Sequence, residues 1–165
     1  MEQTRELSRN ERLDWLRLIR SENVGPITFF QLLGRFGTAA KALDALPELA
    51  RRGGRKKPIR VFPAAAARAE METLEQFGAT LMAAIEPGYP KPLRQIADPP
   101  PILTLHGHPE LLNRDILAIV GARNASAAAI RLTRQIAGEL SKGHLVIASG
   151  LARGIDRSEE HTSEL

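Results

Sequence analysis

The sequence predicts an α/β protein in which a helical N-terminal domain is followed by the start of a parallel β-sheet. Three observations lead to this prediction. Apolar residues recur with helical spacing between residues 11 and 50. Six prolines interrupt residues 86–101, too many for regular structure. Two short apolar runs then flank a second helical pattern between residues 115 and 150, which is the arrangement of a βαβ unit.

The helical part is predicted to hold three short helices within residues 11–50 and a fourth within residues 63–78. Ser8 and Glu11 have the spacing of a capping box, in which each side chain accepts a hydrogen bond from the other residue's backbone N–H. Pro26 stands where the first turn of a helix tolerates proline. These signals mark the starts of the first two helices.

The turn before Pro26 is a candidate for DNA contact. The segment Asn23-Val-Gly-Pro-Ile27 resembles the turn of a helix-hairpin-helix element, which in DNA-binding examples offers backbone N–H groups to phosphate. Here the motif is degenerate. We therefore expect this turn to serve the packing of a helical bundle.

The middle of the chain is predicted to cross from one domain to the next. Strands are expected over residues 79–85 and 101–107, with the proline-rich segment as a rigid connection between them. We divide the chain accordingly into a helical domain, residues 1–78, and the start of a sheet domain, residues 79–156.

The sheet domain is predicted from one βαβ unit. Residues 115–121 and 144–150 are apolar runs that end in glycine, and residues 127–140 have a helical pattern. The two strands should be parallel because a helix connects them. We expect four apolar side chains to share the inner face of the helix, namely Ile130, Leu132, Ile136 and Leu140.

Residues suited to phosphate follow both of these strands. In βαβ units, ligands collect at the carboxyl ends of the strands, where glycine lets a ligand approach the backbone and helix N-termini present free N–H groups. After the first strand stand Gly121, Arg123 and Ser126, and after the second stand Ser149, Gly150, Arg153 and Gly154. The first loop lacks the glycines of the dinucleotide fingerprint, and the sequence has no Walker lysine pattern.

Composition restricts the classes of function. The net charge of +4 and a pI near 10.0 suit an anionic partner, and residues 51–60 carry six basic residues and no acidic one. We expect that run to be a solvated loop, secondary to the strand-end loops in binding the anion.

The chain has no cysteine, which excludes disulfides, thiolate zinc sites and cysteine nucleophiles and fits a reducing cytoplasm. The N-terminus has no apolar run, so neither a signal peptide nor a membrane anchor is expected.

No catalytic or metal-binding constellation is expected. The histidines at 106, 108 and 144 have no ligand-spaced carboxylate beside them. Asp98 and Asp115 lack the partners that would mark acid–base catalysis. We therefore predict a binding protein without catalytic residues, metal or other cofactor.

Three segments carry a resemblance to a known family. Residues 119–126, Ile-Val-Gly-Ala-Arg-Asn-Ala-Ser, and residues 149–156, Ser-Gly-Leu-Ala-Arg-Gly-Ile-Asp, resemble the two signature loops of the DNA-processing protein A (Smf) family. Residues 89–107, which lead up to them, are similar to that family as well. The resemblance runs from about Leu13 to Asp156.

This resemblance implies a helical sterile-alpha-motif-like domain followed by an extended Rossmann-like domain that binds single-stranded DNA in a basic pocket. Members protect incoming single strands in natural transformation and recombination, form homodimers and load the recombinase RecA. The resemblance assigns the phosphate contacts to six residues: Gly121, Arg123, Ser126, Ser149, Gly150 and Gly154. Family members often have Tyr-Gly shortly after the serine, where this chain has alanines at 127–129, so that tyrosine's contact has no counterpart.

Two other functions are compatible with the residues. A related nucleotide-binding Rossmann-like enzyme, of the phosphoribohydrolase type, would show a Pro-Gly-Gly-x-Gly-Thr loop and a nearby glutamate further along the chain. A helical adaptor would act through residues 11–80 alone. The helical N-terminal domain together with Gly121-Ala-Arg123 favours the DNA-binding protein over the enzyme.

The last nine residues are expected to be foreign to the protein. The family pattern would continue after Asp156 into a helix and further strands. Residues 157–165 read instead as the translation of a common sequencing adapter, which predicts a truncated gene and an artefactual tail.

Overall fold

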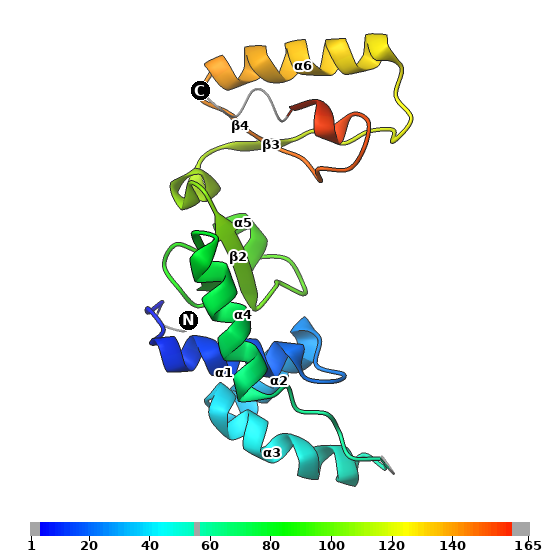
Figure 1. Ribbon diagram of the computed structural model, residues 1–165. Coiled ribbons are helices and arrows are strands. Elements are labelled where there is room, and N and C mark those ends of the chain that lie inside the picture. The colour runs from blue at the N-terminus through cyan, green and yellow to red at the C-terminus, as the bar shows by residue number, and fades with distance from the viewer. Residues whose placement is uncertain (1–3, 55–56, 160–165) are drawn as a thin grey trace. The chain divides into compact units, whose positions relative to one another are not determined.

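The computed structural model describes residues 4–54 and 57–159 and contains two compact units, shown as one ribbon in Figure 1. The first, Met1–Pro109, is called the helical unit here, and the second, Glu110–Leu165, the sheet unit. In the described part of the chain, no helix has the length and apolar character that a membrane span requires, and no group of three or more His, Asp or Glu side chains is placed to hold a metal ion.

Four helices form the first part of the helical unit, as the sequence predicts: α1 (Arg9–Arg20), α2 (Pro26–Phe36), α3 (Ala39–Arg52) and α4 (Ala64–Gln76). The predicted capping box is confirmed. The Glu11 N–H donates to Ser8 Oγ at 3.3 Å, and the Ser8 N–H donates to Glu11 Oε2 at 2.9 Å. Pro26 is confirmed as the first residue of α2, which ends at Gly37 with a φ of 78°.

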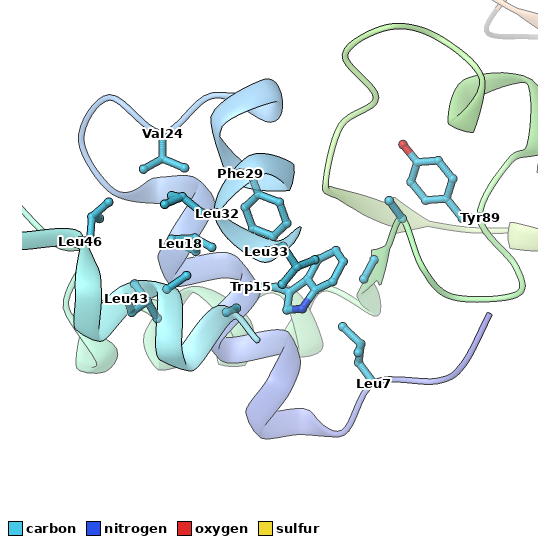
Figure 2. Packing of buried hydrophobic residues seen from close by; sticks show 14 residues of the cluster. Leu7, Trp15, Leu18, Val24, Phe29, Leu32, Leu33, Leu43, Leu46 and Tyr89 are labelled. Carbon is cyan, nitrogen blue, oxygen red and sulfur yellow. The ribbon is translucent and has the colours of Figure 1, made fainter. Parts of the chain in front are cut away.

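The core of the helical unit lies among α1, α2 and α3 (Figure 2). Trp15 of α1 and Phe29 of α2 pack with ring centroids 4.9 Å apart and planes tilted by 60°, an arrangement that aromatic pairs favour. Leu18 and Phe29 are fully buried. The amphipathic spacing read from the sequence is thus satisfied by burying one face of each helix against the others.

The strands β1 (Ala79–Ala83) and β2 (Ile102–His106) pair antiparallel, with the one-turn helix α5 (Lys91–Arg94) between them. We expected this region to start the second domain and its prolines to exclude regular structure. Instead, residues 79–109 belong to the helical unit. Ala83 is buried in the same core as α1 to α3.

One buried carboxylate explains why this region joins the helices. Glu86 is only 2% exposed and accepts hydrogen bonds from the Leu7 N–H at 3.0 Å and the Ala83 N–H at 2.7 Å. Arg12 of α1 donates to the same carboxylate through Nη2 at 2.6 Å. A buried charge requires such partners, so β1 and α1 are held to one another.

The sheet unit contains the predicted βαβ element. The strands β3 (Ile116–Ala118) and β4 (Val146–Ala148) pair parallel, and α6 (Ala127–Lys142) connects them. In Figure 1, α6 runs alongside this strand pair. The α/β class is therefore confirmed. The 3-10 helices η1 (Pro109–Asn113) and η2 (Asp156–Glu159) precede and follow the element.

The predicted inner face of α6 is only partly correct. Ile130 and Leu140 are half-buried and Ala137 is fully buried, whereas Leu132 is 58% exposed and Ile136 is 44% exposed. A residue advances by about 100° around a helix, which puts a residue two positions along on the opposite side. Apolar side chains of β3 are exposed too, with Ile116 at 43%.

The predicted tail begins inside η2, whose last residue is Glu159. Residues 160–165 lie outside the described part of the chain, so this prediction falls largely on residues of which the structure gives no description.

Candidate nucleic-acid interface

The two predicted loops meet in the sheet unit. The N–H of Ile155, in the second loop, donates to the carbonyl oxygen of Ala122, in the first loop, at 3.3 Å. The Gly121 N–H donates to Asp156 Oδ1 at 3.1 Å. The Ser149 hydroxyl donates to the carbonyl oxygen of Asp156 at 2.9 Å. The first two of these hydrogen bonds join the loops that follow β3 and β4, and the third closes the second loop on itself.

The glycines of both loops are required by this close packing. A Cβ atom on Gly121 would lie 2.7 Å from the Ile155 side chain, and one on Gly150 would lie 2.9 Å from Asp156 Oδ2. Gly154 has a φ of 94°, and a Cβ atom there would lie 2.1 Å from the Ala122 carbonyl oxygen. Gly154 thus meets the backbone of the first loop, whereas Gly121 and Gly150 meet the side chains of Ile155 and Asp156, and a residue with a Cβ atom would not fit at these positions without a shift.

Ser126 is the N-cap of α6, and its side chain accepts a hydrogen bond from the Ala129 N–H at 3.2 Å. This serine was predicted to contact phosphate. Its hydroxyl oxygen satisfies one of the N–H groups in the first helical turn, and the phosphate contact stays a prediction. The N–H groups of Ala127 and Ala128 have no acceptor within the helix because of their position. Together with the helix dipole they favour an anion at this end of α6.

Two arginines of the loops are available to an anion. Arg123 and Arg153 are exposed, and neither forms an ion pair with any residue that the structure describes. Arginine presents a planar fork of donors that matches phosphate. Arg123 stands three residues before the N-cap of α6, so the guanidinium and the helix N-terminus belong to one continuous loop.

The net charge does not single out this unit. Residues 110–165 hold seven basic and seven acidic residues, whereas residues 1–109 hold sixteen and twelve. The whole excess of +4 therefore comes from the helical unit. In the sheet unit the favourable feature is the local pairing of loop arginines with a helix N-terminus.

The structure brings all six predicted site residues into the two joined loops but gives several of them partners within the protein. The Gly121 N–H and the Ser149 hydroxyl are both bonded to Asp156. Asp156 and Ile155, which hold the loops together, were not among the predicted site residues. Both stand at the end of the motif Ser149–Asp156, and that position was the available signal.

The hairpin turn between α1 and α2 is closed by another segment of the helical unit. The Glu22 N–H donates to the Arg60 carbonyl oxygen at 3.0 Å, and the Val24 N–H donates to the Ser21 carbonyl oxygen at 3.2 Å. The Phe62 N–H donates to Ser21 Oγ at 3.0 Å. The N–H groups of Glu22 and Val24 are therefore bonded within the unit, whereas Gly25, the N-cap of α2, makes no side-chain cap hydrogen bond.

Two family models match the chain. The model of the "DprA-like N-terminal HHH domain" matches residues 9–73, and the model of "DNA recombination-mediator protein A" matches residues 80–164, more than half of the chain. The chain belongs to the DNA recombination-mediator protein A family. The family resemblance inferred from the signature loops is therefore confirmed.

A curated relative gives the extent of this family match. The chain is 28% identical to Protein Smf of Synechocystis sp. (strain ATCC 27184 / PCC 6803 / Kazusa) over 175 residues, which covers 95% of this chain and 42% of that protein. The chain thus spans about two fifths of the relative's length.

The two family matches meet between residues 73 and 80, close to the predicted boundary after Gly78, whereas the compact units meet at Pro109. In this family member, the first residues of the second matched region therefore fold with the helices. The match runs to residue 164, and the foreign origin of residues 157–165 stays a prediction.

Proposed function

We propose that this protein binds single-stranded DNA through its phosphates, without catalysing a reaction, during DNA processing in natural transformation and recombination. The observation that carries the proposal is the position of Arg123. It is exposed, has no carboxylate partner in the described residues, and lies in the loop that leads to the N-terminus of α6. Membership of a recombination-mediator family supports DNA as the source of the phosphate.

Binding through the backbone fits the residue types of the loops. Arginine, helix N–H groups and glycine contact phosphate in the same way whatever the base sequence is. Aromatic residues are only 4% of the chain, so base stacking is not expected to dominate binding. We therefore expect little preference among base sequences and a strong dependence on salt.

The partners follow from the family resemblance. We propose that the full-length protein forms a homodimer, protects single strands and loads the recombinase RecA in the cytoplasm. Since the chain spans about two fifths of its relative, these properties belong to the proposal for the whole protein.

The experiment is a fluorescence anisotropy titration of the full-length protein with a labelled single strand, the matching duplex and a nucleoside monophosphate. We expect the single strand to bind more tightly than the duplex, with similar affinity for unrelated sequences. Failure to bind either oligonucleotide at low salt would contradict the proposal. The monophosphate is also incubated with the protein in a separate assay. Release of free base from it would favour the phosphoribohydrolase-type enzyme instead.

A further inference from the structure

A buried carboxylate lies between the ends of the two parallel strands. Asp156 is 8% exposed, and its Oδ1 atom accepts the hydrogen bond of the Gly121 N–H at 3.1 Å. Its Oδ2 atom lies against the backbone of Gly150, where a Cβ atom would come within 2.9 Å. Its carbonyl oxygen accepts the hydrogen bond of the Ser149 hydroxyl at 2.9 Å. One residue thus contacts the ends of β3 and β4.

This carboxylate occupies the place where a phosphate would be expected. An anion at the carboxyl ends of parallel strands is held by glycine N–H groups, and the Gly121 N–H already has an anionic acceptor. A phosphate at the same N–H would have to displace Asp156 or lie beside its negative charge. The remaining donors of this loop are the first N–H groups of α6 and the Arg123 guanidinium, which forms no ion pair with a described carboxylate.

We propose that Asp156 is a positioning residue for DNA binding: it acts as a built-in hydrogen-bond acceptor that fixes the two loops and occupies the Gly121 N–H, so that the DNA phosphate binds at Arg123 and the first turn of α6. This inference rests on the proposed function. It assigns Gly121, Ser149 and Gly150 to the support of the loops, and Arg123 to direct contact.

The test compares Asp156→Ala with Asp156→Asn in the full-length protein. Asparagine keeps an oxygen that accepts the Gly121 N–H, whereas alanine leaves that N–H without a partner. We expect single-stranded DNA affinity to fall about tenfold in Asp156→Ala, the cost of one unmade buried hydrogen bond that orders the loop. Asp156→Asn should stay within about twofold of the original protein. Asp115→Ala is the matched control, because it removes an exposed carboxylate before β3.

Amide hydrogen exchange gives a second readout that needs no DNA. The Gly121 N–H should exchange faster in Asp156→Ala than in the original protein and keep its protection in Asp156→Asn. Unchanged DNA affinity in Asp156→Ala, or a loss in Asp156→Asn as large as in Asp156→Ala, would overturn the inference. A general folding defect in Asp156→Ala would be recognised because amides outside the two loops would then also exchange faster than in the original protein. If the original protein fails to bind DNA while the exchange pattern is as expected, the proposed function is wrong and the loop contact is correct.

Discussion

Two turns of this chain look alike in sequence and differ in structure. Residues 21–25 and residues 121–126 each contain a glycine and lead into a helix, and both were considered as sites for phosphate. In the helical unit, the segment around Arg60 is bonded to the first turn, because the Arg60 carbonyl oxygen accepts the Glu22 N–H. In the sheet unit, the second turn is bonded to a neighbouring loop on one side and leaves Arg123 exposed on the other.

The difference shows that the motif alone does not decide whether a turn can bind an anion. What decides is the segment that packs on it. Of the 19 hydrophobic residues buried among the described residues, 18 lie in the helical unit and one, Ala137, lies in the sheet unit. The hairpin turn is anchored in the core by Val24 and bonded to the segment around Arg60, whereas the loops of the sheet unit are held by a few hydrogen bonds and by glycine contacts.

The charges follow the same contrast. In the helical unit, Arg17 pairs with Asp14 at 3.2 Å and Arg20 pairs with Glu70 at 2.8 Å. An arginine that is paired with a carboxylate has less to offer a phosphate. The arginines at 123 and 153 have no such partner in the described residues and stand in the two joined loops, whereas an exposed arginine of the helical unit such as Arg68 stands on a helix, so the proposed contact lies in the sheet unit although its net charge is zero.

Among single substitutions in the helical unit, we expect the largest loss of stability at Glu86. Removing the buried Glu86 carboxylate leaves the N–H groups of Leu7 and Ala83 without their acceptor, and each unsatisfied buried donor costs about 1–3 kcal/mol. We expect Glu86→Ala to lower the free energy of unfolding by about 2 kcal/mol or more in a urea titration. Glu6 binds the same Arg12 at 3.0 Å but has a side chain that is 72% exposed. Glu6→Ala should cost less than about 1 kcal/mol, and an equal loss in both variants would contradict this account.

The same carboxylate predicts a pH dependence. Burial alone would raise the pKa of Glu86. Hydrogen bonds from Arg12 and from the N–H groups of Ala83 and Leu7 lower the pKa by more than burial raises it, so it lies below its usual 4.5. The folded form then holds the ionised group more strongly than the unfolded chain does. Its contribution to stability is complete above pH 4.5 and is lost as the pH falls below that value. The difference in unfolding free energy between the original protein and Glu86→Gln should therefore shrink below pH 4.5.

A pair of glycine substitutions compares the hairpin turn of the helical unit with the joined loops of the sheet unit. Gly154→Ala forces a side chain into a backbone with a φ of 94° and into the Ala122 carbonyl oxygen, whereas a Cβ atom on Gly25 meets nothing within 4 Å. Strain of this kind costs about 1–3 kcal/mol. We expect Gly154→Ala to weaken single-stranded DNA binding by more than about tenfold and Gly25→Ala to leave it unchanged. A loss of binding in Gly25→Ala would show that the hairpin turn takes part.

Arg123 provides a smaller and more specific effect. Each phosphate contact on a single strand contributes roughly 0.7 to the slope of log affinity against log salt. We expect Arg123→Ala to weaken binding by about tenfold at low salt, as for the loss of a charged hydrogen bond, and to lower the slope by that amount. Arg68→Ala, at an exposed position of α4, is the matched control. An unchanged slope in filter-binding titrations would remove Arg123 from the site.

Local signals in the sequence predicted the helices well. The capping box at Ser8 and the proline at position 26 act within a single turn, so residue identity is sufficient to locate these helix starts. The join between β1 and the helices could not be predicted in this way. It depends on Glu86 accepting the Leu7 N–H across 79 positions of the chain, and no periodicity reports such a partner.

The same limit applies to the candidate site. The glycines, Arg123 and Ser126 mark the ends of the strands, and the sequence correctly placed them in two loops. The Gly121 N–H is bonded to a carboxylate 35 residues further along the chain. In the sequence, nothing distinguishes that aspartate from the other acidic residues. The sequence therefore predicted where an anion would lie but not that the protein supplies one of its own.

The smallest effect is expected from the basic run of residues 51–60, which contributes most to the net charge and least to a defined site. Arg51 and Arg52 both pair with Glu48, and their side chains are 72% and 73% exposed. Residues 55 and 56 lie outside the described part of the chain. Exposed charges act over about 10 Å at 0.1 M salt and over longer distances only when salt is low.

Neutralising all six basic residues of this run should therefore slow association with single-stranded DNA at low salt, where long-range attraction increases encounters, and have little effect at high salt. Stopped-flow measurements at two salt concentrations check this, with the dissociation rate as an internal control that should not change. If binding disappeared at both concentrations, the run would be the main site, and the contrast between a closed helical unit and an open pair of loops would be wrong.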